Sequence, residues 1–363
     1  MLESSRRGLL DATVQEIRSW MIEQGHSAYR ALQVIPWVMR HRATSFEEMT
    51  NIPRDLRLRL EAGWTVLSTR VVVHSKSPDG TDKLLLECRD GRRVECVLMT
   101  EARRRTVCIS TQVGCGMGCV FCASGLKGVE RNLTAGEILE QVIRLRNLLP
   151  AGESITHIVV MGMGESLANL DNLIPALDRI CSRELGLGLS QRRVTISTVG
   201  LPGKIRELAA LNRQYHLAVS LHAPTETLRT ALVPVNEKLS LGAVLEAADA
   251  YFQMTGRQVT YEYVLLRGVN DRLQEAEALA NLLQGRKAHV NLIPYNPVPG
   301  LPFARPEARA VNRFVAVLRQ RGIGATIRKT KGQAIDAACG QLRRRLEPGG
   351  SASSVPASTG WMG

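Results

Sequence analysis

The sequence predicts an α/β protein whose larger part is a partial (β/α)6 barrel. Two observations support this fold class. From residue 105 onward, six short runs rich in β-branched and apolar residues alternate with longer runs whose apolar residues recur at helical spacing. Such alternation is typical of a parallel sheet covered by helices. Before residue 101 a helical stretch is followed by a strand-rich stretch, so we expect a separate N-terminal accessory domain.

The accessory domain is expected to span residues 1–100. Its first part, residues 1–62, has apolar residues at helical spacing, and we expect RNA binding as a role for it. Helices are expected over 9–25, over 27–41 with a break or kink at Pro36, and as a helix–turn–helix stretch over 45–63. Residues 64–100 contain short β-type runs separated by turn signals, which predicts a small antiparallel sheet that joins the helical unit to the barrel.

The barrel domain is expected to span residues 101–346. Its strands are expected at 105–111, 154–162, 192–198, 215–223, 258–266 and 288–296, and its helices at 134–149, 170–183, 202–212, 241–254, 272–284 and 305–321. Thr134 and Glu137 form a capping box at the start of the first helix. A last strand-like run, 324–332, leads to Cys339, and the Gly- and Ser-rich tail 347–363 is expected to be disordered.

Composition narrows the class of partner. The net charge of +13 and the pI of about 9.7 favour a polyanionic partner, nucleic acid before an anionic membrane, although basicity without a partner is the alternative. Eight cysteines over 363 residues do not make a disulfide framework. With no signal sequence and no long apolar run, we expect a cytoplasmic protein that does not bind membranes.

Three cysteines, Cys115, Cys119 and Cys122, form a CxxxCxxC triad directly after the first expected barrel strand. This spacing suits a [4Fe–4S] cluster with three irons held by thiolates and one iron left open. S-adenosylmethionine can chelate the open iron, and an electron from the cluster can split it to a 5′-deoxyadenosyl radical. A structural zinc site is the alternative, but it usually needs a fourth ligand, and no second cysteine pair follows.

Polar residues at other strand ends are candidates for binding S-adenosylmethionine, because barrel chemistry gathers at the carboxyl ends of the strands. Gly164 and Glu165 end the second strand in a GMGES stretch. The other candidates are Ser197, Ser220 with Leu221 and His222, and Asn296. Among the remaining cysteines, Cys88, Cys96 and Cys181 fit small buried core residues, whereas Cys108 and Cys339 occupy distinctive stretches.

Six segments of the chain resemble the RlmN/Cfr family of radical S-adenosylmethionine RNA methyltransferases, in order and with matching spacing. They are CISTQVGCGMGCVFCASG, VVMGMGESLANLDN, RRVTISTVG, LAVSLHAPTETLR, VNLIPYNPVPG and IRKTKGQAIDAACGQL. The combination of Cys108, the triad and Cys339 is specific to that family. One departure is Ser166, where the family has Pro after Gly-Glu, and this puts the geometry of the loop in question.

The resemblance implies a radical S-adenosylmethionine barrel and a two-cysteine mechanism that consumes two molecules of S-adenosylmethionine. Cys339 takes the first methyl group by displacement. A methylene radical formed on it adds to the adenine ring, a base removes the ring proton, and Cys108 attacks the Cys339 sulfur to release the product through a transient disulfide. Glu95 matches the family's proton acceptor, although from its strand position alone it is an ordinary exposed Glu.

The implied substrate is adenosine in 23S ribosomal RNA, methylated at carbon 2, together with the adenosine next to a tRNA anticodon. An external electron donor such as flavodoxin or ferredoxin is also implied. Methylation at carbon 8, the Cfr-type activity, uses the same cysteines and is an alternative. A non-enzymatic, metal-containing RNA-binding protein is an alternative of a different class.

Clusters of basic residues are candidates for holding RNA. A solvated surface is the alternative for each of them. In the helical unit the candidates are Arg40, His41, Arg42, Arg54, Arg57 and Arg59, and near the barrel they are Arg103, Arg104, Arg105, Arg328, Lys329, Lys331, Arg343, Arg344 and Arg345.

Overall fold

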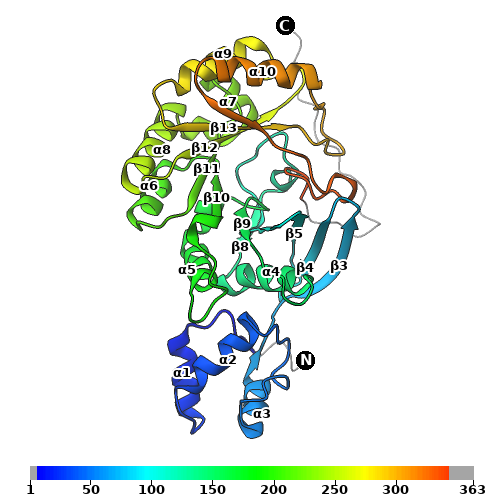
Figure 1. Cartoon of the computed structure of the whole chain (residues 1–363), viewed down its shortest axis with the longest axis vertical. Helices are drawn as coiled ribbons and strands as arrows, with labels where there is room; N and C mark the ends of the chain where they lie inside the picture. Colours follow the sequence, from blue (N-terminus) through cyan, green and yellow to red (C-terminus); the bar gives the residue numbers. More distant parts are fainter. Residues whose placement is uncertain (1–5, 343–363) are drawn as a thin grey trace.

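A curved ten-stranded sheet is the central element of the computed structural model, which describes residues 6–342 (Figure 1). The strand order is β14-β13-β12-β11-β10-β9-β6-β5-β4-β3. The strands are β3 (Arg70–Ser77), β4 (Thr81–Glu87), β5 (Arg93–Glu101), β6 (Arg104–Cys108), β9 (His157–Val160), β10 (Val194–Thr198), β11 (His216–Ser220), β12 (Val259–Leu265), β13 (Ala288–Pro294) and β14 (Gly324–Ile327).

Strand β6 and strands β9 to β14 are parallel and form the partial barrel, which confirms the expected fold class. All six expected strands are present, and β14 adds a seventh from the run predicted to lead to Cys339. The helices between them are α4 (Ala135–Asn147), α5 (Leu170–Cys181), α6 (Pro202–Ala210), α8 (Leu241–Thr255), α9 (Leu273–Leu283) and α10 (Ala308–Gln320). The predicted capping box of Thr134 and Glu137 opens α4. A further helix, α7 (Glu226–Leu232), was not predicted.

The strands before residue 101 have the predicted antiparallel arrangement and join the barrel, but they do so as part of the barrel's own sheet and not as a small sheet beside it. Strands β3, β4 and β5 are antiparallel to one another, and β5 pairs with β6 from Val97 opposite Cys108 to Glu101 opposite Arg104. Only Ala102 and Arg103 lie between β5 and β6. Because a two-residue connection joins adjacent antiparallel strands, it attaches the whole β3–β5 meander to the edge of the barrel.

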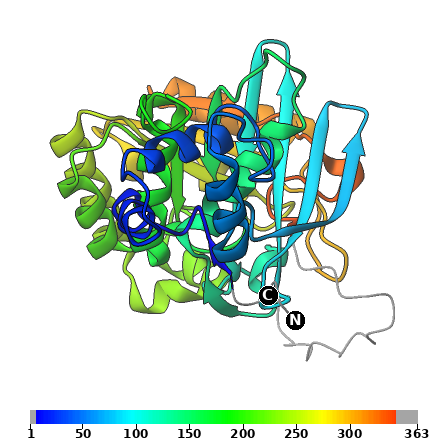
Figure 2. The ribbon, with the colours of Figure 1, turned by 90° about the horizontal axis from the view of Figure 1, so that it is seen from below.

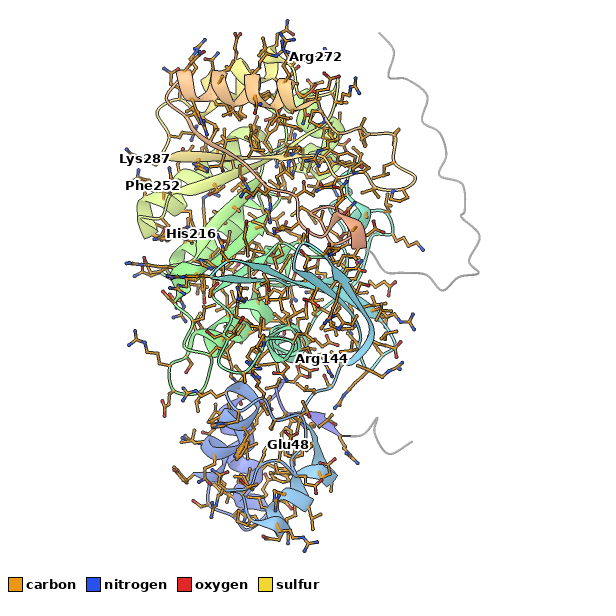
Figure 3. The ribbon with its side chains drawn as sticks, turned by 45° about the vertical axis from the view of Figure 1, so that its right-hand side comes forward. Glu48, Arg144, His216, Phe252, Arg272 and Lys287 are labelled. Carbon is orange, nitrogen blue, oxygen red and sulfur yellow. The ribbon has the colours of Figure 1, made fainter. Side chains whose placement is uncertain are left out.

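Three helices form the N-terminal unit, at the bottom of Figure 1: α1 (Val14–Glu23), α2 (Arg30–Met39) and α3 (Arg54–Gly63). Of the break or kink expected at Pro36, the break is wrong, because α2 continues through Pro36 to Met39. Residues 45–53 are not helical either. The carboxylate of Glu48, labelled in Figure 3, accepts hydrogen bonds from the backbone N–H groups of Thr44 and Ser45, which favours turns over a helix.

The N-terminal unit is held on the barrel by buried polar contacts. The guanidinium of Arg146 on α4 donates to the carbonyls of Val38 and Met39. The carboxylate of Glu140 accepts four hydrogen bonds of 2.6–2.7 Å from the N–H and hydroxyl groups of Ser68 and Thr69. Arg144, labelled in Figure 3, also donates to Thr69. This unit therefore sits directly against the helix that precedes β9.

These contacts correct part of the predicted RNA-docking set. Arg42 donates to the carbonyls of Leu149 and Glu153, and Arg40 donates to the carbonyl of Gly186. Both side chains therefore form hydrogen bonds that join the N-terminal unit to the barrel domain. A positively charged residue bound to carbonyl groups of its own chain has fewer donors left for phosphate, so Arg40 and Arg42 are docking contacts within the protein.

After β14 the chain crosses the open edge of the barrel and reaches the β3–β4 hairpin (Figure 2). The N–H of Gly332 donates to Asp79 Oδ2 at 2.7 Å, and Lys83 Nζ donates to the carbonyl of Asp336 at 3.1 Å. The segment 328–342, which we call the C-terminal strap, is thereby fixed to the β3–β4 hairpin on one side of the opening. Arg343, Arg344, Arg345 and the predicted disordered tail 347–363 lie outside the described residues.

No helix within residues 6–342 has both the length and the apolar character that a membrane span requires.

Candidate active site

The cysteine triad lies on a loop that leaves the barrel after β6. A short hairpin of β7 (Gln112–Gly114) and β8 (Val129–Asn132) closes the base of this loop. Gly114 has φ +83°, and a Cβ there would lie 2.1 Å from the carbonyl oxygen of Gly128, so no other residue fits. The loop places Cys115, Cys119 and Cys122 together on the wall of one cavity of about 160 Å³, which we call the triad cavity.

Burial raises the pKa of all three thiols, that of Cys115 to about 12, and mutual repulsion between the thiolates raises the pKa of Cys115 and Cys119 further. Three neighbouring thiolates in a buried site therefore need a positively charged group to stabilise them. Within residues 6–342 no three or more Cys, His, Asp or Glu side chains are grouped around the position of a single metal ion.

Gly164 and Glu165 lie on the same cavity wall, at the end of β9. The Glu165 carboxylate accepts hydrogen bonds from the N–H groups of Leu167 at 3.0 Å and Val199 at 2.7 Å. The N–H of Glu165 in turn donates to Gln112 Oε1 at 2.8 Å. Burial raises the pKa of Glu165. The residue thus joins the ends of β9 and β10 to the start of the triad loop.

The other strand-end candidates divide in two. Ser197, Ser220, His222 and Asn296 line the triad cavity, whereas Leu221 is fully buried and is not part of its wall. Burial lowers the pKa of His222 to about 3, so its ring is neutral, and Nδ1 accepts the N–H of Val264. His222 has φ +62°, an uncommon conformation for a residue with a Cβ.

Arg229 fixes the backbone around these strand ends, and the sequence analysis did not identify it. The side chain is completely buried on α7. Its guanidinium donates to the carbonyls of Leu221 and Val199 at 3.2 and 2.5 Å, and also to Asn236. The only signal in the sequence is an Arg in a short amphipathic run, which does not distinguish a buried clamp from a solvated side chain.

The C-terminal strap brings Cys339 to the triad cavity, where the side chain lies on the wall. The carbonyl of Gly340 accepts the N–H of Ala123 at 2.8 Å, and the carbonyl of Leu342 accepts the hydroxyl of Ser124 at 2.7 Å. Asn296 Nδ2 donates to the carbonyl of Cys339 at 3.2 Å. The strap is therefore bound on one side to the triad loop and on the other to the end of β13.

Cys339 also lines a second, small cavity of about 30 Å³, whose wall includes Cys108. We call it the two-cysteine cavity. Cys108 is the last residue of β6 and is buried. Burial and the nearby Cys339 raise the pKa of Cys108 to about 12, and the opposing effect of Arg328 is smaller. The two distinctive cysteines, far apart in sequence, thus share one cavity, and one of them also faces the triad.

Arg328 and Glu262 stand at the junction of these cavities. Arg328 lines both, and its guanidinium lies 3.9 Å from the carboxylate of Glu262 on β12. The charges of Cys339, Glu262 and Cys108 raise the pKa of Arg328, and burial raises the pKa of Glu262. Arg328 was expected to hold RNA phosphate from outside; the structure instead places it beside the two cysteines.

Glu95 is buried, with 1% of its surface exposed, so its interpretation as an ordinary exposed strand residue is wrong. Its carboxylate forms a 2.8 Å ion pair with Lys83, which is itself 5% exposed. Glu95 lies on the same face of β5 as Val97, which lines the two-cysteine cavity. The side chain is therefore near that cavity but is not part of its wall.

Comparison with known proteins places this arrangement in a family. Residues 109–283 match the radical SAM superfamily, and residues 8–66 match the ribosomal RNA large subunit methyltransferase N-terminal domain. The chain is 53% identical to a probable dual-specificity RNA methyltransferase RlmN of Rhodopirellula baltica over 336 residues, which cover 93% of this chain and 90% of the relative. The chain belongs to the RlmN family. The probable RlmN of Geobacillus kaustophilus is 44% identical, over 92% of this chain and 91% of the relative.

The fold agrees with a solved member of the same class. The crystal structure of a radical SAM methyltransferase from Sphaerobacter thermophilus superposes with a TM-score of 0.90 at 44% identity, over 93% of this chain and 99% of that one. The protein is therefore an RNA methyltransferase of the radical SAM type, whose cofactors are a [4Fe–4S] cluster and S-adenosylmethionine. The three partly buried thiols on one cavity wall fit such a cluster, because its iron supplies the positive charge that they need.

Ser166, the departure from the RlmN/Cfr pattern, leaves the loop intact. It is the first residue of a short 3-10 helix, Ser166–Asn169, a position where a proline costs no helical hydrogen bond. The preceding Glu165 is extended (φ −90°, ψ 113°), which is the conformation that a following proline requires. Ser166 adds a hydrogen bond from its hydroxyl to the carbonyl of Val160 at 3.1 Å. The same backbone therefore accepts either residue.

Proposed function

We propose that this protein methylates carbon 2 of adenosine in 23S ribosomal RNA and in tRNA next to the anticodon. The observation that carries the proposal is the position of Cys339, which lines both the triad cavity and the two-cysteine cavity. A methyl group on its sulfur is thereby within reach of radical chemistry on one side and of a resolving thiol on the other. The names of the relatives support RNA as the substrate.

We assign the cluster to Cys115, Cys119 and Cys122, which leave one iron open for S-adenosylmethionine. When bound there, the cluster and S-adenosylmethionine supply the 5′-deoxyadenosyl radical. The cosubstrate is held by Gly164 and Glu165 at the end of β9, and by Ser197, Ser220, the backbone of Leu221, His222 and Asn296 around the cavity. Neutral His222 can offer only one ring N–H, since its Nδ1 already accepts a hydrogen bond.

The protein's own thiols carry the methyl group. The Cys339 thiolate takes the methyl group of a first S-adenosylmethionine by displacement, with S-adenosylhomocysteine as the leaving group. After hydrogen removal from this methyl group, its carbon bonds to carbon 2 of adenine, and Glu95 accepts the ring proton. The Cys108 thiolate then attacks the Cys339 sulfur, so the bond from that sulfur to carbon breaks while a disulfide forms. The freed carbon takes up a proton to become the product methyl group, and the one electron in excess leaves to an external one-electron carrier. The shared cavity of Cys108 and Cys339 supports this last step.

A flavodoxin or ferredoxin is the proposed source of electrons for the cluster, and the cytoplasm is the proposed location. Both follow from the chemistry, because a buried triad of reduced thiols and a low-potential cluster need a reducing compartment. RNA is the class of partner that the family supports, and 23S rRNA and tRNA are the proposed members of that class.

Nucleoside mass spectrometry of rRNA and tRNA from cells with and without the gene tests the proposal. The expected product is 2-methyladenosine in both RNAs. Finding only 8-methyladenosine would favour the Cfr-type activity. In a preparation made without oxygen, about four irons per chain are expected. Zinc alone, with no consumption of S-adenosylmethionine, would favour a metal-containing RNA-binding protein.

Replacement of single cysteines separates the steps. Cys339→Ala is expected to abolish RNA methylation while S-adenosylmethionine is still cleaved to 5′-deoxyadenosine. Cys108→Ala is expected to trap the RNA covalently on Cys339. Cys181→Ala is the matched control, because this thiol is partly buried against the core on α5 and lines neither cavity. Normal RNA product from Cys339→Ala would refute the methylcysteine mechanism.

A further inference from the structure

A third cavity opens at the amino ends of the barrel strands, and its lining is unusual for a barrel. It has a volume of about 540 Å³, and we call it the barrel port. The interior of a (β/α) barrel is normally packed with branched apolar side chains. Here the strands contribute polar residues instead: Thr106, His157, Thr195, His216, Thr260 and Asn291. A polar interior left open is typical of a site that receives a ligand.

The charge of the barrel port is strongly positive. Six Arg and Lys side chains line it against two carboxylates, Glu101 and Glu262; the six are Arg104, Arg192, Arg193, Arg328, Lys329 and Lys331. Arg192 and Arg193 precede β10 and are exposed, and within residues 6–342 neither forms an ion pair with a carboxylate. The ligand is therefore expected to be anionic.

The barrel port adjoins the reaction site and shares a wall with it. Met161 and Arg328 line it together with both the triad cavity and the two-cysteine cavity. Met99, Lys329 and Lys331 are further residues that it shares with the two-cysteine cavity. A ligand that enters here meets Arg328 and then Cys339, without passing the cysteine triad loop.

The positive surface also continues outward from the port. Arg193 lines a further hollow between the N-terminal unit and the barrel, together with Arg183. Arg40, Arg42 and Arg146 also line this hollow, but they are bound to carbonyls of the same chain and are not counted among the cations that can bind phosphate. A run of cations that leads from an interior cavity to the surface suits a polymer of phosphates better than a single small anion, because successive phosphates can be neutralised along it.

We propose that the barrel port is where the target nucleotide of the RNA enters, with its flanking phosphates on Arg104, Arg192, Arg193 and Lys329. The base then extends past Arg328 toward Cys339. This inference rests on the proposed function, since it takes RNA as the substrate. Enzymes that modify a base must take it out of its stack, and a single flipped nucleotide fits a cavity of this size.

Two matched double variants test the port. Arg192→Gln with Arg193→Gln removes two exposed cations of the port, whereas Arg309→Gln with Arg313→Gln removes two exposed cations from α10, outside all three cavities. Binding of a fluorescein-labelled 23S rRNA fragment is measured between about 50 and 200 mM salt. Thermal unfolding of each variant checks that the fold is intact.

The port variant is expected to bind RNA about tenfold more weakly than the control, with a salt dependence less steep by about 1.4, or 0.7 for each lost contact to single-stranded phosphate. Arg192→Lys with Arg193→Lys is expected to retain binding, because a positive charge suffices for phosphate. If the port and control variants bound RNA equally well, with the same dependence on salt, the proposal that RNA enters through the barrel port would be refuted. If the wild-type protein methylated no RNA, the proposed function would be refuted instead. The comparison of RNA binding by the two variants would still test whether the barrel port binds RNA.

Discussion

Gly164 is the position at which one added methyl group is expected to do the most damage to the S-adenosylmethionine site. Its φ of +104° is a conformation that favours glycine, so an alanine there carries about 1–3 kcal/mol of backbone strain. A Cβ would also lie 2.7 Å from Gln112 Cβ and 2.8 Å from Gln112 N. Overpacking of this kind costs about 1–3 kcal/mol. Gly164→Ala should therefore destabilise the fold by about 2–6 kcal/mol.

The same clash reaches the site through Gln112. Its side chain accepts the N–H of Glu165, and displacement of Gln112 breaks that 2.8 Å hydrogen bond. Loss of one hydrogen bond that orients Glu165 is worth about 1 kcal/mol or more, so S-adenosylmethionine should bind about tenfold more weakly. The two effects are measured separately, by thermal unfolding and by equilibrium dialysis with the reconstituted protein.

Gly242→Ala is the matched control for Gly164→Ala. Gly242 lies in α8, its φ is not positive, and an added Cβ would meet nothing within 4 Å. This substitution should be neutral or stabilise the protein by about 0.4–1 kcal/mol. At roughly 2 °C per kcal/mol for a long chain, Gly164→Ala should lower the unfolding temperature by about 4–12 °C. An unfolding midpoint and cosubstrate affinity equal to those of the wild type would refute the reasoning.

Three further predictions concern the loop, the pH dependence and the N-terminal unit. Ser166→Pro loses the hydrogen bond to Val160 but no backbone hydrogen bond, so chemical denaturation should show a change within about 1 kcal/mol; a loss above about 3 kcal/mol would contradict the geometry given for this loop. The hydrogen bond from Arg131 lowers the pKa of Asp90 to about 2. The ionised Asp90 carboxylate therefore stabilises the fold above about pH 4, and this stabilisation is lost as the pH falls toward 2. Asp90→Asn should make the free energy of unfolding less dependent on pH in that window, and an unchanged acid unfolding profile would exclude this contribution. Arg146→Met leaves two carbonyls of α2 without their hydrogen bonds from Arg146, at a cost of about 1–3 kcal/mol each. Limited digestion with chymotrypsin should then release the N-terminal unit faster than in the wild type. Equal rates of digestion would show that Arg146 does not hold the N-terminal unit on the barrel.

The order of strands and helices was predictable because it depends on residues that are close together in the sequence. Alternating apolar runs identified every strand of the partial barrel, and the spacing of Thr134 and Glu137 identified the start of α4. The cysteine triad was equally local, since a loop of eight residues carries all three thiols. Ser166 also shows the limit of local reading, because only its backbone conformation explains why serine and proline both fit there.

Only the tertiary structure decided which distant side chains share a cavity. The two-residue turn at Ala102 and Arg103 joins β3–β5 to the barrel, which buries Glu95 with Lys83 instead of exposing it. Arg40 and Arg42 bind carbonyls of the same chain, whereas Arg192 and Arg193 stay exposed, although all four look alike in sequence. Cys108 and Cys339 meet because the C-terminal strap is anchored on both sides of the open barrel. The spacing of residues along the chain determines local helices, strands and turns. Which side chains are buried, which form ion pairs and which distant residues come into contact depend on how the sheet curves and where the C-terminal strap crosses it.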